Sequence, residues 1–69
     1  MVEVFKTNIQ DKSTASKVLE DLYRHFPGYK INFDLEDCDK ILRIENEKVV
    51  PGEVLKILNH NGYFCEVLE

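Results

Sequence analysis

The sequence lacks a long apolar run and an excess of basic residues, and each absence excludes a class of function. No stretch approaches the roughly 18 consecutive apolar residues that indicate a membrane-spanning helix. Lys and Arg number 9 against 13 Asp and Glu, which gives a formal net charge of -4. Because contact with a nucleic-acid backbone requires clustered basic side chains, we expect neither a nucleic-acid partner nor a membrane.

Cysteine is also scarce, and a CxxC pair is absent. The two cysteines, Cys38 and Cys65, are most simply free thiols in a reducing compartment. The first residues, MVEVFK, alternate between apolar and charged side chains and contain no apolar segment of a signal peptide. We therefore expect a cytoplasmic location.

The composition that remains is that of a small globular domain. Hydrophobic residues make up 43% and charged residues 32% of the chain, which does not indicate disorder. A chain of 69 residues buries only roughly 60% of its unfolded surface, so its stability margin is thin. We expect one domain over residues 1–69.

The spacing of apolar residues predicts six elements in the order β-α-β-β-α-β. Alternating β-branched and aromatic residues predict strands at residues 2–9, 29–35, 40–45 and 63–68. A first helix is expected over residues 12–26, with an apolar stripe of Ala15, Val18, Leu19, Leu22 and Phe26. A second helix begins at Pro51 and stops at Asn61–Gly62, where glycine permits a left-handed turn.

This order predicts the class and topology of the fold. Two connections of helical length favour right-handed crossovers between neighbouring parallel strands. The order as a whole is that of the ferredoxin-like α+β sandwich, in which a four-stranded antiparallel sheet carries both helices on one face. The open face of the sheet is expected to be polar, with Lys6, Lys30, Asn32, Asp34 and Arg43.

Four segments of the chain carry a family resemblance. They are FKTNI before the first helix, LYRHFPGYKINFDLE, PGEVLKIL and, above all, the closing NGYFCEVL. In this order and spacing, which cover nearly the whole chain, they resemble the heavy-metal-associated (HMA) domain of copper chaperones and metal-pumping ATPases.

The resemblance breaks where that family binds its metal. The family motif after the first strand is M-x-C-x-x-C, and alignment on the aliphatic Val18 places its three residues at Ile9, Asp11 and Thr14. Cu(I) prefers sulfur ligands, whereas a carboxylate and a hydroxyl are hard donors that form no closed site by themselves. The resemblance therefore implies a lost metal site, with no bound metal and no cofactor. We expect the junction to cap the first helix instead, through Asp11 or Ser13.

The remaining candidate ligands are dispersed along the sequence. Cys65 is expected to be a small buried hydrophobe and Cys38 an exposed turn residue. His25 and His60 lie near the ends of the two helices, where a cation complements the helix dipole. A metal site built from these four residues would need ligands from three separate corners. Tyr63 lies in the loop that borders the metal in the family and is expected to cover the start of the first helix.

The sequence contains no recognisable catalytic arrangement, so we expect no enzyme. The acidic run DLEDCD lacks the glycine and glutamate spacing of a calcium loop and reads as a solvated turn. The favoured hypothesis is a monomeric, non-catalytic HMA-like domain that recognises an unidentified protein partner. Two alternatives stay open: a copper or zinc carrier with non-standard ligands, and a regulatory module of the ACT type whose sheets pair side by side.

Overall fold

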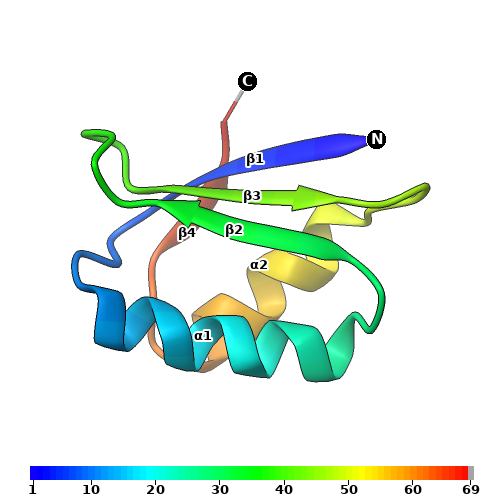
Figure 1. The fold of residues 1–69 in the computed structure, drawn as a ribbon, viewed down its shortest axis with the longest axis horizontal. Coiled ribbons are helices and arrows are strands. Elements are labelled where there is room, and N and C mark those ends of the chain that lie inside the picture. Colours follow the sequence, from blue (N-terminus) through cyan, green and yellow to red (C-terminus); the bar gives the residue numbers. More distant parts are fainter. Residues whose placement is uncertain (69) are drawn as a thin grey trace.

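Six elements follow one another in the predicted order (Figure 1). The computed structural model describes residues 1–68, and Glu69 of the expected domain lies outside the described residues. The strands are β1 (Val2–Thr7), β2 (Lys30–Asp34), β3 (Ile41–Glu45) and β4 (Cys65–Val67), and the helices are α1 (Lys12–His25) and α2 (Pro51–His60). All paired strands are antiparallel, in the order β2-β3-β1-β4. Both helices lie on one side of the sheet, so the ferredoxin-like α+β fold is confirmed.

One expectation about the connections is wrong, because the strands that a helix joins are not neighbours. β3 lies between β1 and β2, and β1 lies between β3 and β4. The β2–β3 hairpin is the reason, since its short turn places β3 directly beside β2, with Phe33 opposite Leu42. β3 then pairs with β1 on its other side, and each helix crosses over one intervening strand.

Neither helix has the length and apolar character that crossing a bilayer requires.

All four strands are shorter than predicted, and in β1 and β4 the missing ends are used in loop contacts. β1 ends at Thr7, whose hydroxyl donates to the Lys40 carbonyl at 2.7 Å and accepts the N–H of Ile9 at 3.2 Å. β4 begins later than predicted because the N–H of Tyr63 still belongs to the end of α2, donating to the Leu58 carbonyl at 2.9 Å.

The hydrophobic core fills the space between the sheet and the helices. Phe5 of β1 and Leu42 of β3 are cross-strand partners, and both are 0% exposed. The helices cover them with Leu22 from α1 and with Val54 and Leu58 from α2, which are equally buried. Burial of each of these side chains stabilises the fold by roughly 1.5–3 kcal/mol. The predicted apolar stripe of α1 therefore faces the core.

α2 ends in the left-handed turn predicted at Asn61–Gly62. Gly62 has φ +89, a conformation that glycine adopts without the clash of a Cβ atom. Its N–H donates to the Asn59 carbonyl at 3.0 Å, while the N–H of Tyr63 donates to the carbonyl of Leu58. These two bonds form a Schellman motif, and the chain turns back toward the sheet beside the end of β1.

The open face of the sheet is polar, as predicted. Lys30 and Asn32 are exposed on β2, and Arg43 of β3 donates to the Asn32 amide oxygen at 3.1 Å. Arg43 also lies 3.9 Å from the Asp34 carboxylate. Val2, Val4 and Ile41 are apolar residues on this face, and of these Ile41 is buried, at 4% exposure.

Candidate functional site at the corner of three loops

Three loops meet at the end of the sheet where β1 leads into α1. The β1–α1 loop is tied to the β2–β3 turn by Thr7, whose N–H donates to the Asp39 carbonyl at 3.2 Å and whose hydroxyl binds the Lys40 carbonyl. It is tied to the α2–β4 loop by Asn8, whose amide oxygen accepts the N–H of Phe64 at 3.0 Å. This is the corner at which the family would hold its metal. Neither Thr7 nor Asn8 was singled out from the sequence.

Ile9, at the position of the family's methionine, is an interior anchor. Its side chain is 1% exposed and belongs to the hydrophobic core. Its N–H donates to the Thr7 hydroxyl, so the backbone is held as well as the side chain. The anchor positions the following residues, which lead the chain into α1.

Asp11 stands at the N-cap position of α1, but its side chain does not form the predicted cap. Its backbone has φ -121 and ψ 155, and its carbonyl accepts the N–H of Ala15 at 3.1 Å. The carboxylate makes no capping hydrogen bond, and Ser13 lies within the helix. Asp11 is exposed, so water competes with its carboxylate for the free N–H groups of the first turn. The expected helix cap is therefore correct in its position and wrong in its hydrogen bond.

Thr14, which aligns with the second cysteine of the HMA motif, is the residue that most affects the Asp11 carboxylate. The pKa of Asp11 lies below its ordinary value of 3.8, chiefly because the Thr14 hydroxyl stabilises the charged form. Desolvation opposes this shift, while the charge of Lys17 adds to it, as does the N–H of Thr14, which lies near the carboxylate without hydrogen-bonding geometry. The two family positions thus present oxygen donors that interact with each other.

Cys65 is the interior thiol beside this corner. It is the cross-strand partner of Thr7 and is 6% exposed, as expected for a small hydrophobe. Burial raises the pKa of Cys65 to about 12, and the charge of Glu66 adds to the shift. Since the thiolate is the form that binds metal, this side chain is in its non-binding form at neutral pH.

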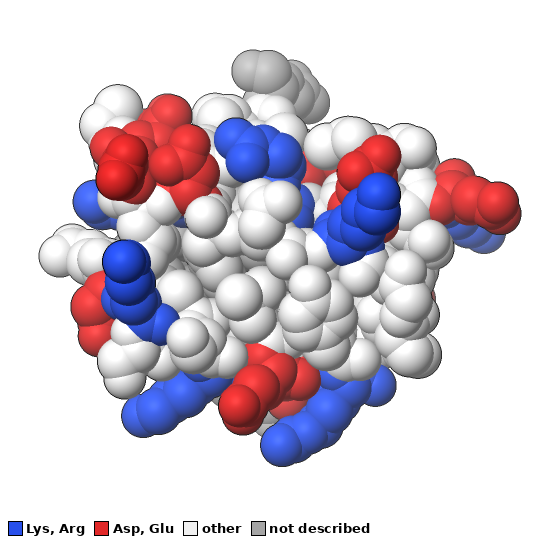
Figure 2. Space-filling model, in the orientation of Figure 1, with Lys and Arg blue, Asp and Glu red and all other residues white. Residues whose placement is uncertain are grey.

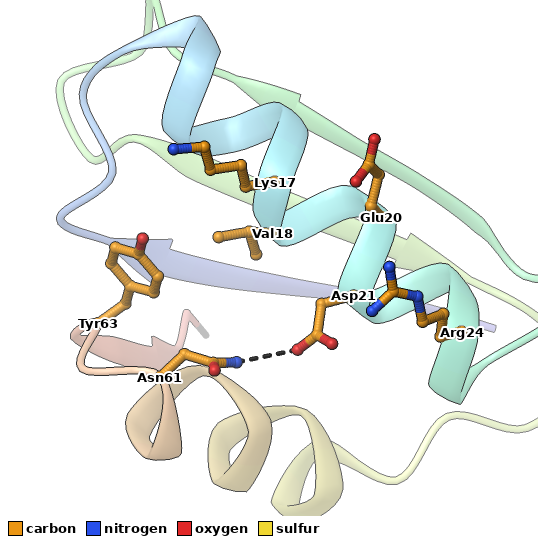
Figure 3. A pocket seen from close by; sticks show the side chains of 7 residues that line it. All are labelled: Lys17, Val18, Glu20, Asp21, Arg24, Asn61 and Tyr63. Carbon is orange, nitrogen blue, oxygen red and sulfur yellow. Dashed lines mark hydrogen bonds between the residues drawn. The ribbon is translucent and has the colours of Figure 1, made fainter.

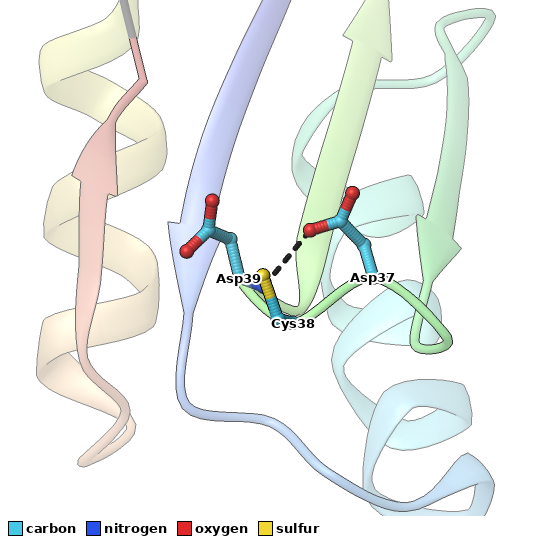
Figure 4. A group of neighbouring side chains, drawn as sticks. All are labelled: Asp37, Cys38 and Asp39. Carbon is cyan, nitrogen blue, oxygen red and sulfur yellow. Dashed lines mark hydrogen bonds between the residues drawn. The ribbon is translucent and has the colours of Figure 1, made fainter.

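Cys38 lies in the β2–β3 turn between two carboxylates (Figure 4). It is an exposed free thiol, as predicted. One ligand atom each from Asp37, Cys38 and Asp39 lies within 4.8 Å of the others. The turn itself explains this proximity, because the Asp37 carboxylate accepts the N–H of Asp39 at 2.9 Å. The Asp39 carboxylate lies 3.7 Å from the Lys6 ammonium.

The two histidines share one groove, so the four candidate ligands lie at three separate places, as expected. His25 of α1 and His60 of α2 line a groove of about 450 Å³ between the helices, together with Asp21 and Asn61. The Asn61 amide donates to the Asp21 carboxylate at 2.9 Å and links the helices. His25 Nδ1 lies 2.9 Å from the Asp21 backbone carbonyl. Both cysteines lie elsewhere, on the β2–β3 turn and on β4.

Tyr63 lies beside the second turn of α1 and not over its first residue. It lines a hollow of about 280 Å³ whose other walls include Lys17, Val18 and Asn61 (Figure 3). The side chain is half-buried. Tyr63 therefore forms one wall of the hollow between α1 and the end of α2.

Comparison with known proteins adds no assignment to this geometry, since no family model, no curated protein and no solved structure matches the chain. The identification of the fold rests on the strand order and the helix placement.

Proposed function

We propose that this chain is a small non-catalytic domain related to the HMA family, which has lost the family's thiophilic metal site and acts by recognising a protein partner. The ferredoxin-like topology and the four family-like segments support the relationship. The first alternative, a metal carrier with unusual ligands, receives less support from the corner where the loops meet. The second, an ACT-like module, predicts paired sheets, and sedimentation tests it.

The donor set at the β1–α1 junction carries this proposal. After the buried Ile9 in the sequence, the two positions that align with the family's cysteine ligands hold the oxygen donors Asp11 and Thr14. Oxygen donors are a poor match for Cu(I), which selects thiolates. Ca²⁺ takes about six to eight oxygen ligands, and Mg²⁺ usually keeps several waters and binds substrate phosphates as well as carboxylates, so a lone carboxylate and a hydroxyl do not form a closed site for either.

The thiols of the chain support the same proposal and a cytoplasmic location. Cys65 is buried and protonated, and Cys38 is an exposed thiol grouped with carboxylates. Histidine is the usual base beside a cysteine nucleophile, and both histidines lie in the groove between the helices, away from the β2–β3 turn and β4. Exposed thiols persist unpaired in reducing compartments, which favours the cytoplasm.

Metal titration followed by NMR tests the proposal. Cu(I) and Zn(II) are added separately to the reduced protein, and amide shifts are followed at residues 9–15, at Tyr63 and at residues 37–39. We expect no stoichiometric binding in the submicromolar range. Tight binding with shifts at residues 9–15 would refute the loss of the site, and tight binding with shifts at residues 37–39 would establish the alternative of a carrier with unusual ligands.

A double variant provides the positive control. Asp11→Cys with Thr14→Cys restores two thiols at the helix start, where the helix dipole favours thiolates, and we expect it to bind Cu(I) stoichiometrically. The matched variant, Lys17→Cys with Glu20→Cys, has the same spacing at exposed positions in the middle of α1 and should bind much more weakly. Equal binding by both double variants would show that the assigned register has no special role.

A further inference from the structure

β2 is an edge strand with backbone groups that face away from the sheet. Among the described residues 1–68 it pairs only with β3, since the strand order is β2-β3-β1-β4. The Ile31 carbonyl accepts the Tyr23 hydroxyl at 3.0 Å, so it points outward from β3. Because the directions of backbone N–H and C=O groups alternate along a strand, those of Phe33 also point away from β3. The backbone groups of Lys30, Asn32 and Asp34 point toward β3.

An apolar groove runs beside this edge. It lies between α1 and β2, has a volume of about 490 Å³, and its apolar walls are formed by Ala15, Leu19, Ile31, Phe33 and Leu35. Figure 2 shows a band of uncharged side chains across this side of the molecule, with acidic and basic groups above and below it. An extended segment added to β2 would therefore place alternate side chains against apolar surface.

The charges on β2 make the edge complementary to itself. The strand reads Lys30-Ile-Asn-Phe-Asp34, with opposite charges at its two ends. A two-fold axis at Asn32 would place each Lys30 opposite the Asp34 of a second copy, and each Ile31 opposite the second copy's Phe33. The outward-facing residues are then the ones that meet, so the backbone groups of Ile31 and Phe33 are in register for hydrogen bonding between the copies. Opposite charges across neighbouring strands stabilise such pairs.

The other edge of the sheet does not have this property. β4 consists of Cys65, Glu66 and Val67. The N–H of Leu68 donates to the Val4 carbonyl at 2.9 Å. By alternation, the backbone N–H and C=O groups of Cys65 and Val67 therefore point away from β1. A two-fold axis between them would place Glu66 opposite its own copy, and like charges in that position are destabilising.

We propose that β2 is a self-association edge: two copies pair antiparallel through Lys30–Asp34 about an axis at Asn32 and join their two four-stranded sheets into one continuous sheet. This inference rests on the proposed recognition function and specifies that the partner is a second copy of this chain. The contact is one five-residue strand and its groove, which is small beside the roughly 1,200–2,000 Å² of a standard interface. The dimer is therefore weak and concentration-dependent, unlike the monomer expected from the sequence.

Tyr23 limits this association. Its hydroxyl donates a hydrogen bond to the Ile31 carbonyl that points away from β3. In the dimer this carbonyl accepts a hydrogen bond from the N–H of the second copy's Phe33. Tyr23→Phe removes that competing donor and keeps the ring. We expect the variant to dimerise several-fold more tightly than the wild type, an increase that general destabilisation of the fold would not produce.

Charge exchange provides the decisive test, measured by sedimentation equilibrium over a roughly hundredfold range of concentration. Lys30→Asp places acids opposite Asp34, and Asp34→Lys places bases opposite Lys30, so each variant alone should associate about tenfold more weakly. An equimolar mixture of the two variants should associate again, because every facing pair then has opposite charges. Glu66→Lys, on the other edge, is the matched control and should leave association through β2 unchanged.

The outcomes separate this inference from the proposed function. Dimerisation with concentration-dependent shifts at the Ile31 and Phe33 amides, lost in the single charge variants and regained in their mixture, supports the inference. A monomer at the highest concentration, for both wild type and Tyr23→Phe, overturns it, as does a mixture that fails to associate although circular dichroism shows both variants folded. None of these results bears on metal binding, whereas tight metal binding at the β1–α1 junction would refute the proposed function alone.

Discussion

Replacing Thr7 by valine tests whether a single hydroxyl holds the corner of three loops together. The side chain is 5% exposed, and its hydroxyl bonds both the Lys40 carbonyl at 2.7 Å and the Ile9 N–H at 3.2 Å. Valine has nearly the same shape but no hydroxyl. The variant therefore removes both hydrogen bonds and leaves the core packing of β1 in place.

The expected cost follows from the burial of the two partners. The Ile9 N–H is buried, and a buried donor without a partner costs about 1–3 kcal/mol. The bond to Lys40 is only part-buried, so solvent can replace it and its loss costs about 0.5–1.5 kcal/mol. We expect Thr7→Val to lower the free energy of unfolding by about 2–4 kcal/mol. A domain of 69 residues has a total of roughly 3–10 kcal/mol, so the variant would be marginally stable.

Urea denaturation monitored by circular dichroism measures this loss. With a slope near 1 kcal/mol/M for a small domain, the midpoint should fall by about 2 M or more at an unchanged slope. Thr7→Ser is the control, because it keeps the hydroxyl and should cost only about 1 kcal/mol for the lost methyl group. If serine and valine destabilise the protein equally, the hydroxyl does not hold the loops and the assignment of Thr7 is wrong.

Three further predictions concern the ends of the helices and the interior thiol. Gly62→Ala should cost about 1–2 kcal/mol in urea denaturation, because φ is +89 there, whereas Gly52→Ala, which has open space and no left-handed φ, should stabilise α2 by about 0.4–1 kcal/mol. Because burial raises the pKa of Cys65 from 9.0 to about 12, the unfolded chain releases this proton above pH 9 while the folded chain retains it. The free energy of unfolding should therefore fall between pH 9 and 12, by at most about 1.4 kcal/mol per pH unit, and Cys65→Ala should lose this part of the slope. Thr14→Val should raise the pKa of Asp11 toward 3.8 in an NMR titration, and an unchanged pKa would exclude the hydroxyl as the cause.

The elements and the core were predictable because they depend on local periodicity. The stripe that includes Leu22 could be read from helical spacing, and the stop at Gly62 from a residue type that tolerates positive φ. Lys30 and Asn32 were assigned to the open face of the sheet by alternation, and both are exposed there. Each of these inferences uses residues only a few positions apart.

The features that were missed depend on contacts between distant residues. Thr7 acquires its role from a turn 33 positions away. His25 and His60 share a groove because α1 and α2 pack side by side, which helix periodicity does not reveal. The capping bond of Asp11 failed for a different reason, since residue type indicates where a cap can form and rotamer and solvent decide whether it does.

The proposed edge pairing leaves the corner of three loops accessible, so the two proposals can be tested in one molecule. The β2–β3 turn follows directly after Asp34, at the end of β2 nearest the corner. An antiparallel partner runs in the opposite direction, so the two-fold axis at Asn32 sends the two corners to opposite ends of the joined sheet. Association through β2 should therefore be the same for the wild type and for the metal-loaded Asp11→Cys, Thr14→Cys variant. If loading that variant with Cu(I) abolishes the β2 dimer, the two regions contact each other and the proposed axis is misplaced.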